Sequence, residues 1–284
     1  MSFSKPEWFK IRLPASPQYS AVASHLRRYQ LYTICLEARC PNRSACWSEG
    51  TATFLILGNR CTRHCAFCAV ARGRPLRPDP DEPRKIAEVI TLLGIRYAVI
   101  TSVTRDDLPD GGASVFAATV EAIRRLCPST LIELLIPDFQ GSEEALQLVF
   151  ASRPDVIGHN LETPVSIYPL INRKEENYFR SLRIIKRAKE SGFITKSGLM
   201  VGLGESRQDL RQAMKDLIEA GCDLLTIGQY LQPTRASRPV VRFYSPQEFT
   251  DLEREALEFG FKAVASGPLV RSSYLARQLY SRAF

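Results

Sequence analysis

Three cysteines lie close together in the chain, with three residues between Cys61 and Cys65 and two between Cys65 and Cys68. A structural zinc site or a fully protein-held iron–sulfur cluster usually recruits four side-chain ligands. Three thiolates can hold three corners of a cuboidal 4Fe-4S cluster and leave the fourth iron open to another molecule. This spacing predicts a reactive cluster rather than a zinc knuckle or inert thiols. We expect His64, within the triad, to be a loop residue and not a ligand.

A second triad lies just upstream, at Cys35, Cys40 and Cys46. Six of the eight cysteines of the chain therefore fall within 34 residues. Cytoplasmic thiols stay reduced, and clustered cysteines there bind metal more often than they form disulfides. The remaining two, Cys127 and Cys222, are isolated, and we expect them to be small buried hydrophobic side chains.

The rest of the chain alternates between two patterns that could position these cysteines. Short apolar runs rich in β-branched residues predict six strands, at Thr53–Leu57, Tyr97–Ser102, Leu131–Ile136, Asp155–Leu161, Thr195–Val201 and Asp223–Ile227. Helical periodicity separates them, at Pro83–Leu93, Ser114–Leu126, Glu143–Phe150, Tyr178–Ser191 and Arg207–Ala220. Consecutive βαβ units predict an α/β fold with a parallel sheet, here a partial, open (βα)6 TIM-like barrel. Chemistry in such barrels sits at the C-terminal ends of the strands, where the first triad follows the first predicted strand.

Segments at both ends flank this predicted barrel. Residues 1–50 read as an irregular extension that carries the upstream triad, with one helix near Ala21–Leu31. Residues 51–230 form the predicted barrel. Residues 231–284 form a C-terminal extension with a last helix at Pro246–Gly260 and a short run at Phe261–Ala265. We find no interdomain linker or low-complexity segment, so we expect one compact domain.

The composition is that of an ordinary globular protein with a basic excess. The chain has 284 residues, and its 38 Lys and Arg against 30 Asp and Glu give a net charge of +8. The excess indicates either a generally basic surface or attraction to an acidic protein or a phosphate-bearing ligand. The basic residues are scattered, which disfavours nucleic acid as a partner. No run of 18 apolar residues and no signal-like N-terminus is present, so we expect a soluble, cytoplasmic protein without a membrane partner.

The first triad, with its strand, resembles the motif of the radical S-adenosylmethionine (radical SAM) superfamily. The resemblance implies that the open iron binds the amino and carboxylate groups of S-adenosylmethionine. An electron from the reduced cluster then cleaves the sulfonium and yields a 5′-deoxyadenosyl radical. Phe67 fits the aromatic position of that motif and could pack against adenine; ordinary loop packing is the alternative.

The upstream triad resembles the auxiliary-cluster motif of the lipoyl synthase family. Further matches cover most of the chain, from about residue 30 to 275, and include segments 39–42, 105–113, 159–163, 195–200, 228–234 and 271–274. The resemblance implies two 4Fe-4S clusters, with S-adenosylmethionine as the other cofactor. It also implies that Ser273, or alternatively Ser272, is the fourth ligand of the auxiliary cluster, since a serine holds iron less firmly than a thiolate does. From the sequence alone, both serines would be read as caps of a tail helix.

Several polar residues and glycines follow the predicted strands. Closely spaced glycines let a backbone approach a ligand, here the adenosine, although a tight turn between strand and helix would need them equally. The residues that we expect to bind S-adenosylmethionine are Phe67, Thr101, Ser102, Glu162, Gly198, Gly202 and Glu205. Of these, Thr101 and Ser102 would seat the methionine part, and Glu162 would accept hydrogen bonds from the ribose.

Charged residues near these positions leave alternatives open. The loop with Asp106, Asp107 and Asp110 is either a solvated acidic turn or part of the cavity between the two clusters. We expect Arg271, in the C-terminal tail, to order that tail over the cavity. Four basic residues either face an acidic carrier protein or belong to the solvated surface: Arg173, Lys174, Arg235 and Arg238.

The resemblance implies a sulfurtransferase that inserts two sulfur atoms, at C6 and C8, into a protein-bound octanoyl-lysine. Implied partners are an octanoylated lipoyl carrier domain (a 2-oxoacid dehydrogenase E2 or a glycine cleavage H protein), a low-potential donor such as ferredoxin or flavodoxin, and an iron–sulfur carrier. We expect a monomer. Two rival interpretations are another sulfur-inserting radical SAM enzyme, such as a biotin-synthase-like protein or a tRNA methylthiotransferase, and a non-enzymatic iron–sulfur carrier or zinc scaffold.

Overall fold

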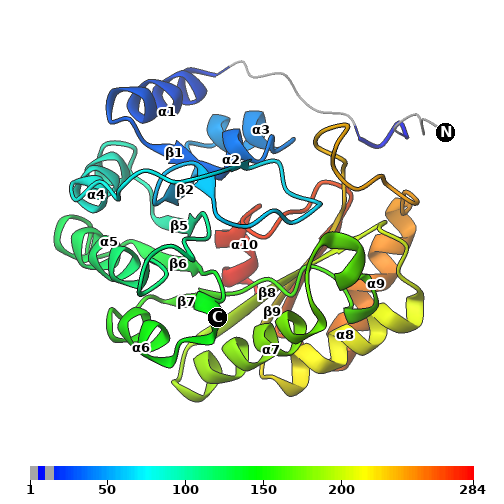
Figure 1. Ribbon diagram of the computed structural model, residues 1–284. Helices are drawn as coiled ribbons and strands as arrows, with labels where there is room; N and C mark the ends of the chain where they lie inside the picture. The colour runs from blue at the N-terminus through cyan, green and yellow to red at the C-terminus, as the bar shows by residue number, and fades with distance from the viewer. Residues whose placement is uncertain (1–5, 10–15) are drawn as a thin grey trace.

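A computed structural model describes residues 6–9 and 16–284. One large sheet forms its centre, with the strand order β1-β2-β5-β6-β7-β8-β9-β10 (Figure 1). Every neighbouring pair from β2 onward is parallel, and only β1 pairs antiparallel, with β2. The strands are β1 (Tyr32–Thr33), β2 (Thr53–Ile56), β5 (Tyr97–Ser102), β6 (Leu131–Leu135), β7 (Val156–Gly158), β8 (Ile194–Val201), β9 (Leu224–Gln229) and β10 (Ala263–Gly267). The predicted partial barrel is confirmed, and β10 adds one parallel strand to the six expected.

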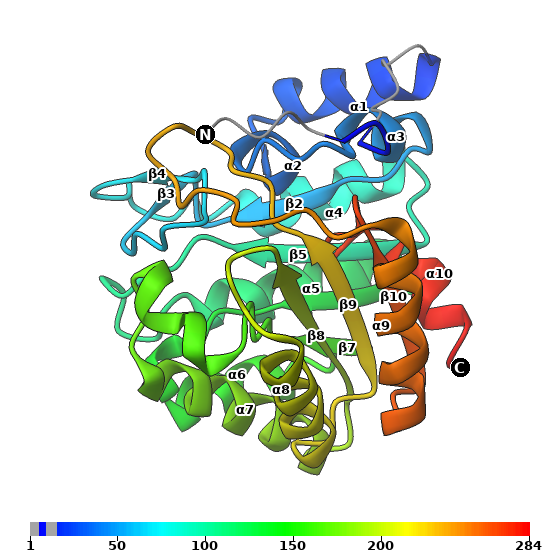
Figure 2. The same ribbon diagram turned by 90° about the vertical axis from the view of Figure 1, so that its right-hand side faces the viewer.

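Helices that connect the parallel strands cover the outside of the curved sheet (Figures 1 and 2). They are α4 (Glu82–Leu92), α5 (Ala113–Leu126), α6 (Glu143–Ala151), α7 (Glu175–Glu190), α8 (Arg207–Glu219) and α9 (Pro246–Phe259). Their predicted positions are confirmed to within a few residues because capping residues mark the ends. Ser245 and Glu248 form a capping box at the start of α9, and Gly260 ends that helix with a φ of 108°.

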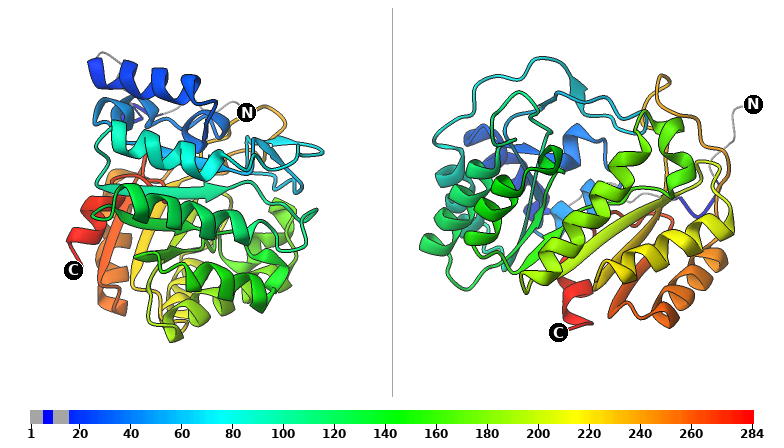
Figure 3. Two further views of the ribbon diagram at one scale, coloured as in Figure 1. Left: turned by 90° about the vertical axis from the view of Figure 1, so that its left-hand side faces the viewer. Right: turned by 60° about the horizontal axis from the view of Figure 1, so that its bottom comes forward.

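The N-terminal extension is more regular than we expected from its prolines. The predicted helix near Ala21–Leu31 starts earlier, as α1 (Pro17–Arg28), because Ser16 accepts a hydrogen bond from the Tyr19 amide and Pro17 suits the first helical turn. After β1 come two short helices, α2 (Ile34–Glu37) and α3 (Arg43–Ser48). The expectation of an irregular segment was wrong here. Figure 3 shows this extension stacked next to α4, with α5 on the far side of α4.

The C-terminal segment folds back onto the first residues of three strands, β5, β9 and β10. Within the described residues, the end strands β1 and β10 do not pair with each other. A further short helix, α10 (Ala276–Ser281), was not predicted. Buried Ala276 belongs to one packed cluster with Tyr97 and Val99, and buried Leu279 belongs to another with Leu224 and Ala263. The packing of α10 thereby anchors the tail between β10 and α10 to the starts of these strands.

Candidate functional site

The first cysteine triad lies directly beyond the C-terminal end of β2. A two-residue strand, β3 (Arg60–Cys61), carries its first cysteine and pairs with β4 (Ala71–Arg72). Cys61, Cys65 and Cys68 all line one cavity of about 700 Å³. The ends of β5, β6 and β7 line the same cavity, so the triad faces the mouth of the barrel as the strand order predicts.

An ion-pair network fixes the loop between the first two cysteines. The Arg63 guanidinium donates to both Asp106 carboxylate oxygens, at 2.6 and 2.7 Å, and its Nη2 lies 2.7 Å from Asp138 Oδ1. Burial by itself would raise the pKa of the Asp138 carboxyl, but Arg63 outweighs burial and lowers the pKa. The amide and hydroxyl of Thr62 also donate to the Thr104 carbonyl, at 3.1 and 3.0 Å. The loop after β5 therefore holds the cysteine loop after β2.

The other two aspartates of the acidic loop have different partners. Asp107 forms a bidentate pair with the buried Arg105, at 2.8 Å for both bonds, and Arg105 Nη1 donates to the Leu57 carbonyl at 3.3 Å. Asp110 accepts from the amides of Gly112 and Ser114 at the start of α5. Because each carboxylate has its own protein partner, the loop is an ordered connection and not simply a solvated acidic turn.

Arg173 lies inside the cavity beside the second cysteine. Its Nε donates to Cys65 Sγ at 3.4 Å, and its guanidinium carbon lies 5.6 Å from the centre of the Phe67 ring. Burial would lower the pKa of Arg173, but the negative charges of Cys65 and Glu162 outweigh burial and raise the pKa. Arg173 is thus directed inward, whereas the neighbouring Lys174 is exposed at the cavity mouth.

Four of the residues expected to bind S-adenosylmethionine line this cavity: Phe67, Thr101, Ser102 and Glu162. The Thr101 hydroxyl donates to the Leu135 carbonyl at 2.9 Å. The buried Ser102 hydroxyl has no hydrogen-bond partner within the described residues, so it is available to a ligand. Glu162 has a left-handed φ of 72°, and burial raises the pKa of its carboxyl. A strained residue at a strand end is typical of a ligand site.

The other three expected residues have packing roles and do not line the cavity. Glu205 is buried, and its carboxylate accepts from the amides of Gly202 and Leu203 and from the Tyr244 hydroxyl. A Cβ at Gly202 would lie 2.0 Å from Gln229 Nε2. A Cβ at Gly198 would lie 3.2 Å from Ser272 Oγ, in the tail. Their contact with S-adenosylmethionine stays a prediction.

The upstream triad lies among the short elements of the N-terminal extension. Cys35 belongs to α2, Cys46 to α3, and Cys40 lies between them, where its amide donates to the Cys35 carbonyl at 3.1 Å. Burial raises the pKa of all three thiols, to about 12 for Cys46. The three cysteines are also close together: the charge of Cys40 raises the pKa of Cys35, and the charges of Cys35 and Cys40 raise that of Cys46. Only two short helices and a turn fix their spacing.

The C-terminal tail reaches this triad from the far end of the chain. The Asn42 side chain, between Cys40 and Cys46, donates to the Leu269 carbonyl at 2.6 Å. Burial lowers the pKa of Arg271. Arg271 is also close to Cys40, and its positive charge partly offsets the rise that burial causes in the pKa of that thiol. Ser272 Oγ accepts from Asn160 Nδ2 at 2.7 Å. The interpretation of the tail serines as helix caps was wrong, since α10 begins after Leu275 without a side-chain cap.

The donor set fits iron–sulfur clusters. Burial raises the pKa of Cys68 to about 11, so the thiolate needs a nearby cation, which iron supplies. In the part of the chain that the structure describes, no three His, Cys, Asp or Glu side chains are close enough to hold one metal ion. A cuboidal cluster binds each cysteine through a different iron, so its ligands are spread more widely.

Several residues that shape the site were not singled out from the sequence. They are Asn42, Arg63, Asp138 and Asn160, each joined to a partner far along the chain. Arg63 could have been predicted to take part in the site, because this arginine lies within the first triad in the sequence. Its acidic partners could not be predicted, since several aspartates follow the ends of the predicted strands.

The chain is similar to proteins of one family over almost its whole length. A model of the radical SAM superfamily matches residues 55–217. The lipoyl synthase of Rubrobacter xylanophilus is 51% identical over 276 residues, which cover 96% of this chain and 86% of the relative. The lipoyl synthase of Caldicellulosiruptor saccharolyticus is 48% identical over 280 residues, which cover 98% of both chains.

Solved structures share the fold at low sequence identity. Streptococcus suis SuiB bound to S-adenosylmethionine has a TM-score of 0.56 and 12% identity, covering 77% of this chain and 51% of SuiB. The chain thus spans about half the length of that protein. Methylornithine synthase (PylB) has a TM-score of 0.54 and 13% identity, covering 90% of this chain and 78% of its own. Among the described residues, no helix is both long and apolar enough to span a bilayer.

Proposed function

Because the chain belongs to the lipoyl synthase family of radical SAM enzymes, we propose that its two cysteine triads hold two clusters with different tasks. The reaction of this sulfurtransferase inserts sulfur at C6 and C8 of a protein-bound octanoyl-lysine, using S-adenosylmethionine and 4Fe-4S clusters. When bound, the cluster on the first triad supplies the electron that generates the radical, and the cluster on the upstream triad supplies sulfur. The approach of the C-terminal tail to the upstream triad is the single observation that carries this assignment.

Ser273 is our choice for the fourth ligand of the upstream cluster. The Ser272 hydroxyl already accepts from Asn160, whereas the Ser273 hydroxyl makes no hydrogen bond to any residue that the structure describes. The contact between Asn42 and the Leu269 carbonyl brings the tail beside Cys40 and Cys46. A hydroxyl oxygen binds iron less firmly than a thiolate does, which suits a cluster that must lose iron and sulfur.

The residues of the first triad's cavity bind and orient S-adenosylmethionine in this proposal. The unpartnered Ser102 hydroxyl would bond to the methionine part, Phe67 would pack against adenine, and Glu162 would accept from the ribose. Arg173 would balance negative charge next to Cys65. The buried Thr101, Ile136 and His159 line part of the cavity, whereas Gln140 and Lys174 line it at exposed positions.

The finer assignments of partners and organisation also belong to the proposal. We assign residues 1–50, 51–230 and 231–284 to one compact domain that works as a monomer in the cytoplasm. Its octanoylated substrate would be carried by an acidic domain of a 2-oxoacid dehydrogenase E2 or a glycine cleavage H protein. A ferredoxin or flavodoxin would deliver electrons, and an iron–sulfur carrier protein would rebuild the upstream cluster. Arg173 is turned inward, so Lys174 is the better candidate of that pair for contact with the carrier.

One experiment tests the assignment of function. Protein reconstituted without oxygen should bind about eight irons, because each 4Fe-4S cluster contains four. With S-adenosylmethionine, dithionite and an octanoyl-lysine peptide, it should form lipoyl product and 5′-deoxyadenosine. The isolated Cys127 offers a matched control, and Cys127→Ser should keep all the iron. Four irons, or 5′-deoxyadenosine without sulfur insertion, would contradict the proposal; absence of both products would favour a non-enzymatic iron–sulfur carrier.

A further inference from the structure

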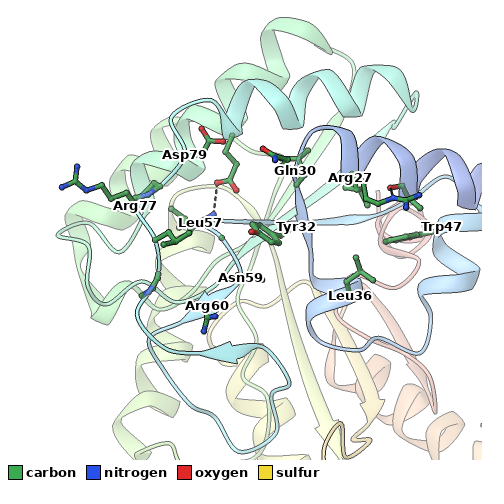
Figure 4. A pocket seen from close by; sticks show the side chains of 18 residues that line it. Arg27, Gln30, Tyr32, Leu36, Trp47, Leu57, Asn59, Arg60, Arg77 and Asp79 are labelled. Carbon is green, nitrogen blue, oxygen red and sulfur yellow. Dashed lines mark hydrogen bonds between the residues drawn. The ribbon is translucent and has the colours of Figure 1, made fainter.

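A second hollow, outside the cavity described above, opens beside the N-terminal extension. This groove has a volume of about 710 Å³, as large as many ligand pockets. Its walls come from the C-terminal half of α1, from β1 and α2, from the turn after β2, and from the segment between β4 and α4. Figure 4 shows the groove from close by, with Tyr32 near its centre.

Exposed apolar side chains gather along the groove. Tyr32, Leu36 and Leu76 have exposed fractions of 37, 43 and 83%. The buried side chains of Leu26 and Trp47 form part of the floor beneath them. Single exposed apolar residues are common on proteins, but several around one concave surface are typical of an interaction site.

The groove also carries positive charge that the protein itself does not neutralise. Arg27, Arg60 and Arg77 line it, and none of the three forms a salt bridge within the residues that the structure describes. Figure 4 shows Arg77 and Arg60 on one side of Tyr32 and Arg27 on the other.

The two carboxylates that line the groove are already engaged. Asp79 pairs with Lys85 at 2.7 Å. The buried Glu82 accepts from the Leu57 amide at 2.8 Å, a bond drawn as a dashed line in Figure 4. Arginine and tyrosine are among the residues that most often dominate protein binding, and the groove offers three arginines and the exposed Tyr32. It therefore suits an acidic protein surface with a protruding apolar side chain.

The groove and the cluster cavity share a wall. Arg60 lines the groove, and the next residue, Cys61, lines the cavity. On the other side, Leu36 lines the groove and Ile34 lines the cavity, with Cys35 of the upstream triad between them. A protein seated in the groove would therefore lie next to both triads, within reach of a long flexible acyl-lysine arm.

We propose that this groove is the docking surface for the folded, acidic part of the octanoylated carrier domain. The inference rests on the proposed function and adds the place where the substrate protein binds. The carrier's acidic residues would pair with Arg27 and Arg77, and an apolar side chain would contact Leu76. The octanoyl-lysine would then extend past the shared wall into the cavity.

The test compares a carrier protein with a short peptide that bears the same octanoyl-lysine. Dithionite is the reductant, so that no protein donor takes part. The groove variants are Arg27→Glu, Arg77→Glu and Leu76→Ser, all at exposed positions. The matched controls are Arg28→Glu on the same helix and Arg74→Glu on the same loop, which are exposed but do not line the groove.

We expect the ratio of kcat/KM for the carrier to kcat/KM for the peptide to fall about 10-fold in each groove variant and to stay within about 2-fold in the controls. For the unmodified enzyme, KM for the carrier should rise between about 50 and 500 mM salt, because salt screens surface charges. Iron content should be unchanged in every variant.

Two results would overturn the docking site. The ratio could stay constant, even if carrier and peptide turnover both fall, or the ratio could fall as far in the control variants as in the groove variants. Sedimentation of the same variants adds a third: a dimer that dissociates without a change in the ratio would make the groove a contact between two copies of this chain. Lipoyl formation from the peptide by the unmodified enzyme tests the proposed function separately, whichever result the variants give.

Discussion

The two cysteine triads use similar residues but are built in different ways. The first lies in a single loop after β2, and the pairing of Arg63 with Asp106 holds that loop to the next strand's loop. The upstream triad lies on two short helices, and the polar contacts around it reach a tail more than 200 residues away, through Asn42 and Leu269. A locally built site can stay intact through many turnovers, whereas a site completed by a distant tail can be opened and rebuilt.

Removing one cysteine from each triad should give the largest effects and separate the two tasks. Cys61→Ala should leave about four irons and abolish 5′-deoxyadenosine formation, because the open-iron cluster is lost. Cys46→Ala should also leave about four irons but still form 5′-deoxyadenosine, without lipoyl product. Iron analysis and product quantification by mass spectrometry measure both. If the two variants behaved alike, the triads would not have separate functions.

The tail serines should differ by a smaller but clear margin. Ser273→Ala should lower sulfur insertion at least about 100-fold, because the loss of a residue that only supports a metal ligand can already cost that much and Ser273 is the proposed ligand itself. The radical step should continue, because the first triad does not contact the tail serine. Ser272→Ala should lower sulfur insertion less, because the Ser272 hydroxyl accepts a hydrogen bond from Asn160 and is not the proposed cluster ligand. Ser273→Cys should keep the upstream cluster yet release sulfur slowly, because a thiolate holds iron more tightly. Equal losses in both alanine variants would contradict the choice of Ser273.

The loop contact of the first triad should have an intermediate effect. Asp106→Asn removes the charge that holds Arg63, so 5′-deoxyadenosine formation should slow about 10-fold. The electron paramagnetic resonance spectrum of the reduced cluster should change its response to S-adenosylmethionine. The control is Asp110→Asn in the same loop, which weakens the start of α5 and should lower the free energy of unfolding by about 1 kcal/mol. If the spectrum of Asp110→Asn changed as well, the contact between Asp106 and Arg63 would only stabilise the loop and would have no specific effect on the cluster.

A buried carboxyl behind the first triad should make stability depend on pH. Burial raises the pKa of Glu82 from 4.5 to about 7 in the folded protein. The folded state holds this proton more tightly than the unfolded state, so the contribution is full below about pH 4.5 and is lost as pH rises through about 7. Urea unfolding at pH 5 and 7.5 should show a smaller loss of stability in Glu82→Gln than in the unmodified protein. An identical pH dependence in both would show that Glu82 does not titrate in this range.

The strands and helices of the barrel could be predicted because their patterns are local. Val99, Ile100 and Ile132 belong to near-continuous apolar runs, which are typical of buried parallel strands. The small elements at the ends could not be predicted. Strand β1 has only two residues and exists because Tyr32 and Thr33 pair with β2. Helix α10 has six residues, too few to be stable alone, and packing of Ala276 and Leu279 stabilises it.

The sequence by itself determined the chemistry of this protein. The spacing of Cys61, Cys65 and Cys68 places three thiolates in one loop, and a spacing along the chain controls geometry over that short range. Only the tertiary structure decided which distant groups meet them. It joined Arg63 to Asp106, brought the tail to Asn42, and left Arg27 and Arg77 around an apolar groove. The physical reason is that such contacts depend on how the packed elements lie against one another, and many pairings fit the same sequence equally well.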